Sequence, residues 1–452
     1  MTANEESARG SWGSKVAFIF AAAGSAIGLG NIWRFPMAVG QNGGAVFVLV
    51  YLIAVALVGF TVMLAELAIG RHGQRNPVGA IERIKPRSPW KVIGYLGILG
   101  AVCLLSFYSV VAGWAVGYLV KTASGAFQGE ITSQLTDRVF TDFSANPWQV
   151  LFYFIIIIVI TTYIISKGVK GGIERWTKIL MPMLFILIVF LAIRALTLPG
   201  AEAGISFYLK PDFTKLNGTV ILYALGQAFF SLSLGMGTMI TYGSYIPKSD
   251  NLVSSAGWVC FADTLIAFLA GIIIFPTLFA IPGIEPTAGE SLVFKVLPLI
   301  FSKIPGGLFF GTLFFLLLIV AALTSTISLL EVPVAYFVDE RNWSRRKASW
   351  IIGLLAFILG IPSALSTGGV RFLTEINFIG NMNFIFGNLW LAVGALLICL
   401  FLGFIWGVKN AAKEIYSGNP RFKLRPLWSF SVKFLTPIVI ILILIFIKNV
   451  VA

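Results

Sequence analysis

Residues 21–36 read AAAGSAIGLGNIWRFP, and this stretch decides the fold because it places glycines, an arginine and a proline inside an apolar run. Glycine and proline interrupt helices, and an arginine is costly in lipid. In a membrane, an interrupted helix exposes backbone amides and carbonyls that need protein, water or a ligand as partners. The stretch therefore predicts a discontinuous membrane helix with a binding site at its break.

The composition is that of an integral membrane protein. Of the 452 residues, 58% are hydrophobic and 12% are charged, which leaves no room for a sizeable soluble domain. Apolar stretches of roughly 18 or more residues number about eleven. We therefore expect an all-α integral membrane protein with about 11 transmembrane helices, built as a single membrane domain over residues 1–452.

The charge of +14 indicates topology rather than a nucleic-acid partner. The basic residues gather in alternate loops between the apolar stretches, which places the amino terminus in the cytoplasm by the positive-inside rule. The single histidine, and the lack of a phosphate loop or a metal-ligand motif in the sequence, argue against an enzyme and against a nucleotide-driven pump.

A second interruption matches the first. The first span carries IGLG at 27–30 and the sixth carries LGMG at 234–237. Paired glycine-broken spans are typical of inverted-repeat transporters that bind their substrate near the bilayer midplane. At each break the carbonyl end of one half-helix suits a small cation, and the amide end of the next suits a carboxylate.

Polar residues beside these breaks are the further candidates for binding. Intramembrane carboxylates are costly and usually functional, which singles out Asp263 in the seventh span and Glu66 in the second. Ser231, Thr324 and Ser325 are weaker candidates, since hydroxyls in membrane helices often bond to their own backbone. No nucleophile and base are paired with them, so the pattern indicates binding rather than catalysis.

Several motifs resemble one family in their order along the chain. The opening stretch continues as QNGGAVFVLVY, and FYSVVAGW, GIERWTKILMP, GQAFFSLSLGMG and ALTSTISLLEVPVAYFVDE follow it. The chain thereby resembles the neurotransmitter:sodium symporter family with the leucine-transporter fold, over nearly its whole length. That resemblance implies a five-plus-five inverted repeat with broken helices 1 and 6. Its parts would be a first repeat of about 12–197, a second of about 218–406 and an extra helix of about 427–450.

The resemblance also implies the site residues. A first sodium site is expected at Ala26, Asn31, Ser231 and Asp263. A second is expected at Gly24, Ile27, Ala321, Thr324 and Ser325. Substrate contacts are expected from Ser25, Ala26, Leu29, Gly30, Leu104, Tyr108, Phe230, Ser231, Ser233, Met236, Ser325 and Leu329. The expected gating residues are Arg9 with Asp339 on the cytoplasmic side and Arg34 with Asn377 on the outer side.

The chain departs from the family pattern at three positions. Gly28 stands where the monoamine branch has an aspartate, which favours amino acids over amines. Asp263 stands where chloride-dependent members have asparagine, so we expect no chloride requirement and a proton on Asp263 during the empty return step. Asn377 replaces the acid that normally faces Arg34, so a hydrogen bond or Glu375 would have to complete the outer gate.

Together these features predict a sodium-coupled symporter that imports a bulky hydrophobic or aromatic L-amino acid by alternating access. We expect a substrate with a large side chain because the pocket walls are apolar, at Leu104, Phe230, Met236 and Leu329. The expected partners are the amino acid, sodium ions and the lipid bilayer of a bacterial inner membrane, with no nucleic acid. The alternatives are a carrier of amines or compatible solutes, a non-transporting amino-acid receptor, and an ion channel.

Overall fold

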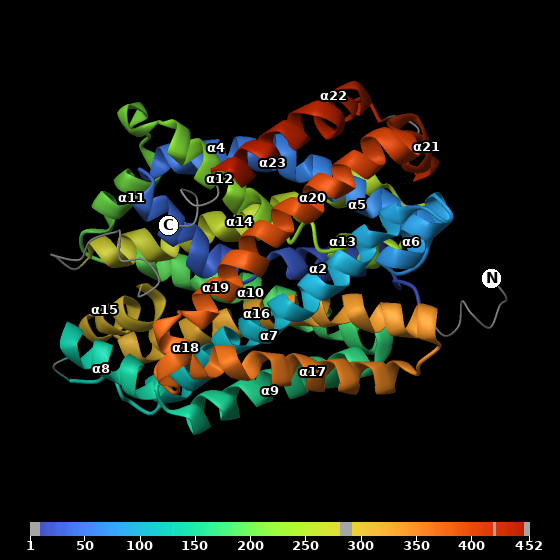
Figure 1. Ribbon diagram of the computed structural model, residues 1–452. Helices are drawn as coiled ribbons and strands as arrows, with labels where there is room; N and C mark the ends of the chain where they lie inside the picture. Colours follow the sequence, from blue (N-terminus) through green and yellow to red (C-terminus); the bar gives the residue numbers. More distant parts are fainter. Residues whose placement is uncertain (1–9, 130, 281–291, 419–421, 447–452) are drawn as a thin grey trace.

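A computed structural model describes residues 10–129, 131–280, 292–418 and 422–446, and all regular structure within these ranges is helical (Figure 1). The first half contains α2 (Lys15–Ala26), η1 (Gly30–Arg34), α3 (Phe35–Gln41), α4 (Ala45–Ala54), η2 (Val55–Gly59), α5 (Phe60–Gly73), α6 (Pro77–Ile84), η3 (Pro89–Lys91), α7 (Val92–Ala123), α8 (Ser133–Ser144), α9 (Pro147–Ser166), η4 (Val169–Glu174), α10 (Arg175–Leu196) and α11 (Ala201–Leu209). The second half contains η5 (Phe213–Lys215), α12 (Gly218–Ser231), α13 (Thr238–Gly243), α14 (Leu252–Phe279), η6 (Leu292–Val296), α15 (Leu297–Lys303), α16 (Gly307–Arg341), α17 (Arg345–Leu365), α18 (Arg371–Glu375), α19 (Phe378–Phe384), η7 (Ile385–Leu389), α20 (Trp390–Leu400), η8 (Phe401–Gly407), α21 (Val408–Gly418), α22 (Arg425–Phe430), η9 (Ser431–Leu435) and α23 (Thr436–Ile445).

The long apolar helices agree with the expected membrane architecture. In the described ranges, 9 helices are long and apolar enough to cross a membrane, and the bent pair α2 with η1 and α3 brings the number to 10. The short apolar helix α12, which is followed by α13 after a gap, lies where the sequence places its sixth span. The expectation of an all-α membrane protein with about eleven spans is compatible with this arrangement.

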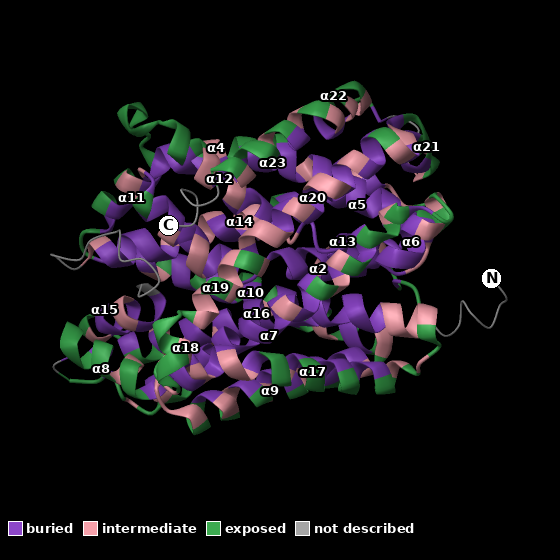
Figure 2. Cartoon of the chain, in the orientation of Figure 1, coloured by how far each residue is buried: buried purple, intermediate pink, exposed green. Residues whose placement is uncertain are grey.

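Burial separates central helices from peripheral ones. The most apolar window of α16 is 89% buried inside the protein, whereas that of the span containing α10 is 39% buried. Figure 2 shows the buried residues concentrated along α2, α7 and α16. Helices α7, α9, α16 and α17 pack against one another in the lower half of Figure 1, and α2 packs against α10, α14 and α16. The first broken span is therefore at the centre of the molecule.

Side-chain caps set the beginnings of several helices. Ser14 accepts a hydrogen bond from the amide of Ala17 at the start of α2, and Asn217 and Asn251 cap α12 and α14 in the same way. Such caps satisfy amides that have no partner within the first turn of a helix. The first helix of each broken span thus begins at a capped residue, and the interruption follows in the middle of the span.

The first break follows α2 directly. Ile27 leaves the helix with an extended backbone (ψ 113°), and the following segment Gly30–Gln41, which begins with the π-helical turn η1, is bent by 53° from α2. The second break covers residues 232–237, between α12 and α13. Gly235 and Gly237 have φ angles of 87° and 76°, which favour glycine, and a Cβ on Gly235 would lie 2.1 Å from the carbonyl oxygen of Leu391. Both glycine pairs named by the sequence thus lie at chain breaks.

Residues 281–305, a mixed stretch with several prolines, lie only partly inside the described ranges. Residues 281–291 lie outside them, and the rest forms η6 and α15. Phe294 of η6 is buried among Trp33, Trp114, Tyr118 and Phe140, with ring centres 5.1–6.0 Å apart. Contacts of this kind favour edge-to-face or offset stacking. The aromatic cluster fixes η6 against α7 and α8.

A buried ionic cluster joins distant segments at the other end of the molecule. The Arg71 side chain on α5 is fully buried, and its Nε lies 2.8 Å from Glu414 Oε1 on α21. Its Nη1 donates to the carbonyl oxygen of Asp250, at 2.6 Å, in the loop before α14. Lys248 Nζ and His72 Nδ1 also contact the Glu414 carboxylate, at 2.9 Å and 3.0 Å. A buried arginine needs such partners, because an unpaired buried charge is strongly destabilising.

Candidate functional site

The first break exposes amides that lie beside two side chains. The amide of Leu29 donates to the Tyr108 hydroxyl at 2.9 Å, and the amide of Gly28 donates to Asn31 Oδ1 at 3.0 Å. The carbonyl of Gly30 accepts from Gln227 Nε2 at 3.0 Å. Side chains of α7 and α12 therefore satisfy backbone groups that a continuous helix would satisfy itself. These two amides lie at the end of the break that the sequence suggested for a carboxylate.

The second break is held in a similar way. The fully buried Glu66 accepts the amide of Gly235 through Oε1 at 2.7 Å. Ser233 has a φ of 53°, which is uncommon for a residue other than glycine, and its hydroxyl donates to the carbonyl oxygen of Ser25 at 2.9 Å. Strained backbone of this kind clusters at binding sites. The two breaks thus contact each other directly through Ser233 and Ser25.

Asp263 on α14 is the centre of a buried oxygen cluster. Its carboxylate accepts from Asn31 Nδ2 at 2.7 Å and from the Ser231 hydroxyl at 2.9 Å and 3.0 Å. The Tyr51 hydroxyl adds a contact at 3.3 Å. All these donors are neutral, and among the described residues no salt bridge reaches Asp263. A buried charge without a charged partner is costly, so the cluster suits a bound cation.

Three of the four residues expected at the first sodium site are therefore together. The fourth, Ala26, is the last residue of α2, and the chain leaves the helix at Ile27 directly after it. The Asn31 amide presents its nitrogen to Asp263 and its oxygen to the amide of Gly28. Tyr51 was missed by the sequence reasoning, because nothing in the apolar stretch around it distinguishes its hydroxyl from that of an interfacial tyrosine.

The residues expected at the second sodium site also meet. Thr324 Oγ1 on α16 lies 3.3 Å from the carbonyl oxygen of Ile27 and 2.9 Å from that of Ala321. Ser325 Oγ lies 3.3 Å from the same Ile27 oxygen. A Cβ on Gly24 would lie 3.2 Å from Thr324 Cβ, so α2 and α16 are in close contact here. This group consists of carbonyl and hydroxyl oxygens, which are suitable ligands for a hard cation.

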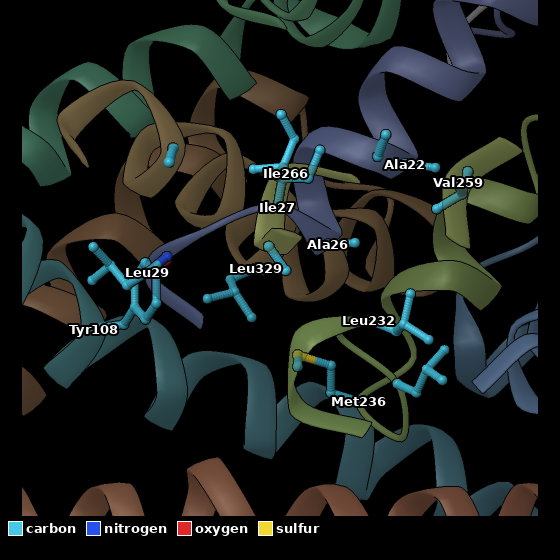
Figure 3. Close-up of a cluster of buried hydrophobic side chains, with 14 of the residues drawn as sticks. Ala22, Ala26, Ile27, Leu29, Tyr108, Leu232, Met236, Val259, Ile266 and Leu329 are labelled. Atoms are coloured by element: carbon cyan, nitrogen blue, oxygen red, sulfur yellow. The ribbon is translucent and has the colours of Figure 1, made fainter. Parts of the chain in front are cut away.

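The expected substrate contacts surround the region between the two breaks. Leu29, Tyr108, Met236 and Leu329 belong to one cluster of buried side chains from four separate segments (Figure 3). Leu104 is also buried, one turn before Tyr108 on α7. On the polar side, the Ser25 hydroxyl donates to Ser328 at 2.7 Å. Ser328 is a further residue that the sequence reasoning missed.

The space beside Gly28 is narrow. A Cβ at this position would lie 2.5 Å from Ser325 Oγ and 2.6 Å from the Tyr108 hydroxyl oxygen. Real Cβ contacts are longer than this, so both side chains would have to move to admit even an alanine. An aspartate, as in the monoamine branch, would need still more room. The site thus excludes a side chain at the point where an amine carrier would need one.

A cavity of about 590 Å³ opens next to the first break, on the α3 side. Leu29, Gly30, Tyr108 and Phe230, all expected substrate contacts, form part of its lining. Arg34 also lines it, with its guanidinium 4.1 Å from the centre of the Phe230 ring and its Nη2 2.5 Å from Asn388 Oδ1. A cation over an aromatic face is a favourable arrangement. Arg34 therefore lies in the wall of the cavity, over the ring of Phe230.

At the outer side, the described contacts of Arg34 include a residue that the sequence did not name. Asn377 lines the same cavity but is exposed and begins α19 with a φ of 47°. Glu375, the other expected candidate, pairs with the exposed Arg371 at 2.7 Å. The residue whose contact with Arg34 is seen is Asn388, eleven positions after Asn377. Asn388 could not be predicted from the sequence, because the direction of its side chain depends on the π-helical turn η7.

The end of α2 away from the cavity packs against α13 and α16. Trp12 Nε1 donates to the carbonyl oxygen of Tyr242 at 3.1 Å, and the Tyr245 hydroxyl donates to Glu331 at 2.6 Å. The Arg345 guanidinium pairs with the Glu331 carboxylate at 2.7 Å. Asp339 Oδ2 accepts from the Asn76 amide at 2.7 Å, and its expected partner Arg9 lies outside the described residues.

Comparison with known proteins supports the same architecture. A sequence profile described as the sodium:neurotransmitter symporter family matches residues 9–133 and 125–452. An uncharacterized sodium-dependent transporter of Bacillus subtilis is 39% identical, with 96% of each chain covered. The serotonin transporter of Drosophila melanogaster is 30% identical over 83% of this chain and 67% of its own. The crystal structure of MhsT in complex with L-phenylalanine superposes with a TM-score of 0.88 at 43% identity, covering 98% of this chain and 100% of that one.

Proposed function

The chain belongs to the sodium:neurotransmitter symporter family and is a sodium-dependent multi-pass membrane transporter rather than an enzyme, and from this premise we propose that it imports a bulky hydrophobic or aromatic L-amino acid by alternating access. The observation that carries the substrate class is the pairing of the Leu29 amide with the Tyr108 hydroxyl beside Gly28. These two groups can both donate to a carboxylate. Because there is no room for an acidic side chain at position 28, the site suits a zwitterionic amino acid better than an amine without a carboxylate.

The pocket walls support a large apolar side chain on that amino acid. Leu104, Met236 and Leu329 are buried and apolar, and methionine adapts to ligands of different shape. The similar transporter MhsT, whose structure contains L-phenylalanine, supports an aromatic ligand for this chain as well. The remaining proposed contacts are the small or polar residues Ser25, Ala26, Gly30, Ser231, Ser233 and Ser325 with the ring of Phe230.

We propose two sodium sites, one at each oxygen cluster. Ala26, Asn31, Ser231 and Asp263 would hold one ion next to the substrate carboxylate. Gly24, Ile27, Ala321, Thr324 and Ser325 would hold the other between α2 and α16. Oxygen ligands of this kind replace the hydration shell of a hard cation. Because both clusters include residues of the broken α2 span, ions bound there would order the break before the amino acid arrives.

We propose that this uptake needs no chloride. Asp263 supplies a fixed negative charge in the first cluster, so an anion from solution is not needed to balance the cations. A proton on Asp263 would remove the uncompensated buried charge when the empty protein returns. The return step would then not require a bound cation at that cluster.

We also propose the orientation and the internal symmetry. The amino terminus would face the cytoplasm of a bacterial inner membrane, which puts the cavity of about 590 Å³ on the outer face. The repeats would span about 12–197 and 218–406, with a separate helix at about 427–450. Arg9 and Asp339 would close the inner side, and Arg34 would close the outer side together with a residue of the α19–α20 segment.

Radiolabelled uptake into proteoliposomes tests the proposed function. An inward sodium gradient should drive accumulation of L-phenylalanine, and unlabelled bulky apolar amino acids should compete better than glycine, glutamate or monoamines. Replacement of chloride by gluconate should leave the rate unchanged, and replacement of sodium by potassium should abolish it. Preferential competition by an amine or by betaine would favour the compatible-solute carrier instead. Binding without sodium-driven accumulation would favour a receptor.

The second sodium cluster yields a specific prediction. Replacing Thr324 by Val removes the hydroxyl that faces the Ile27 carbonyl but keeps the shape of the side chain. We expect the sodium concentration for half-maximal uptake to rise about tenfold, because one of five ligands is lost. The matched control is Thr312→Val, at an exposed hydroxyl on the same helix that bonds only to Leu308. An unchanged sodium dependence in Thr324→Val would remove Thr324 from the proposed site.

A further inference from the structure

Arg34 occupies a defined position at the mouth of the site. Its guanidinium lies over the Phe230 ring, 4.1 Å from the ring centre, and its Nη2 donates to Asn388 Oδ1 at 2.5 Å. Arg34 comes from the broken span and Asn388 from the turn before α20. Because all three residues line the same cavity, the contact between them lies across the route by which a ligand would enter.

The direction of the Asn388 amide is fixed by a second contact. Its Nδ2 donates to the carbonyl oxygen of Asn383, five residues earlier, at 3.0 Å. That bond spans the π-helical turn η7, which inserts one extra residue and leaves carbonyls before it without their usual helical partner. With the nitrogen engaged in this way, the oxygen of the amide must face Arg34. The π-helical turn thus orients an acceptor toward the guanidinium.

The Phe230 ring is held between two glycines. A Cβ on Gly30 would lie 2.8 Å from Phe230 Cε1, and a Cβ on Gly387 would lie 3.5 Å from Phe230 Cε2. Gly387 is the residue immediately before Asn388. The same turn therefore contributes both a surface for the ring and an acceptor for the cation above it. Arg34, Phe230, Gly387 and Asn388 form one contact set between the broken α2 span and the α19–α20 segment.

We infer that Asn388 is a positioning residue of the outer gate, which holds Arg34 on Phe230 and thereby slows escape of the bound substrate to the outside. This inference rests on the proposed uptake function. The acceptor is uncharged, so its strength comes from the geometry of a charge-assisted hydrogen bond rather than from an ion pair. Asn377, which the sequence favoured for this role, is exposed and sits at the start of α19.

The inference makes a prediction for release and for affinity. In Asn388→Ala, purified protein loaded with tritiated L-phenylalanine in sodium buffer should release it about five- to tenfold faster on dilution, as expected for loss of one hydrogen bond to a charged group. The KM for uptake should rise by a similar factor while Vmax stays within about twofold of the wild-type value. A merely structural defect would instead lower Vmax and leave the release rate of the folded fraction unchanged.

A conservative variant and a matched control sharpen the test. Asn388→Asp keeps an oxygen toward Arg34 and adds a charge, so release should be as slow as in the wild type or slower. Asn410→Ala removes an asparagine that also donates its Nδ2 to a preceding carbonyl, that of Trp406, but lies far from Arg34 on α21. It should match the wild type in release, KM and Vmax.

Two results would overturn the inference. One is an Asn388→Ala release rate and KM within about twofold of the wild type. The other is an Asn388→Asp variant that releases substrate as fast as Asn388→Ala, since the acceptor oxygen would then be irrelevant. Failure of the wild-type protein to accumulate L-phenylalanine would instead contradict the proposed function, so the two failures are distinguishable in the same set of measurements.

Discussion

In chloride-free sodium buffer, the Asp263→Asn variant should take up L-phenylalanine at least about 100-fold more slowly than the wild type, because the buried cluster loses the negative charge that faces the cations. The asparagine keeps the size of the side chain and can still accept from Ser231. Addition of chloride should restore part of the rate in the variant and should have no effect on the wild type. Initial uptake rates in proteoliposomes, with gluconate replacing chloride, give the measurement.

The control for this charge removal is Asp142→Asn on α8. Asp142 is exposed and makes only a long surface ion pair with Arg138, so its loss should leave uptake unchanged. If Asp263→Asn transported at the wild-type rate in gluconate, the carboxylate would not be the counter-charge for sodium. If the variant were slow in both anions but bound sodium normally, the proposed chloride-independence would lose its physical basis.

The Gly28→Ala variant should lose about 100-fold in kcat/KM for L-phenylalanine while remaining folded. Its new methyl group would lie 2.5 Å from Ser325 Oγ and 2.6 Å from the Tyr108 hydroxyl, so it would displace one proposed sodium ligand and one proposed carboxylate donor together. A displacement of catalytic or binding groups by about 1 Å is sufficient for a loss of this order. Uptake kinetics together with the melting temperature of the purified protein separate this effect from unfolding.

The matched substitution is Gly257→Ala on α14. A Cβ there would meet nothing within 4 Å, and alanine is the better helix former, so activity should be retained and stability should not fall. A Gly28→Ala variant that transported within about threefold of the wild type would show that the pocket accepts a side chain at position 28. The argument against an amine-binding aspartate would then fail as well.

The positions of the two helix interruptions could be predicted from the sequence, because glycines and polar residues inside apolar stretches mark them locally. The glycines at 28, 30, 235 and 237 indicated where the two spans are interrupted, and the chain leaves helical geometry at 27–28 and 232–237. Of the polar residues in apolar stretches, Asp263 contacts the side chain of Asn31 and Thr324 contacts the carbonyl of Ile27, so both lie beside the first break. The family resemblance then supplied partners that no spacing rule gives.

The residues that the sequence reasoning missed share one physical cause. Tyr51, Ser328 and Asn388 acquire their roles from the rotation of one helix against another, which is decided by packing across the whole core. For Asn388 the rotation comes from one extra residue in a π-helical turn, and such a turn has no clear signature in a single sequence. Gln227, which bonds to the Gly30 carbonyl, was missed for the same reason.

The burial of Arg71 has a consequence for biogenesis. Its carboxylate partner Glu414 is encoded 343 residues later, so the ribosome must produce most of the polypeptide before this guanidinium can be neutralised. During that interval the nascent amino-terminal hairpins carry an uncompensated cation that favours the aqueous face of the insertion machinery over the lipid interior. Only a chain that extends through α21 can therefore form the contact that joins α5 to this late segment.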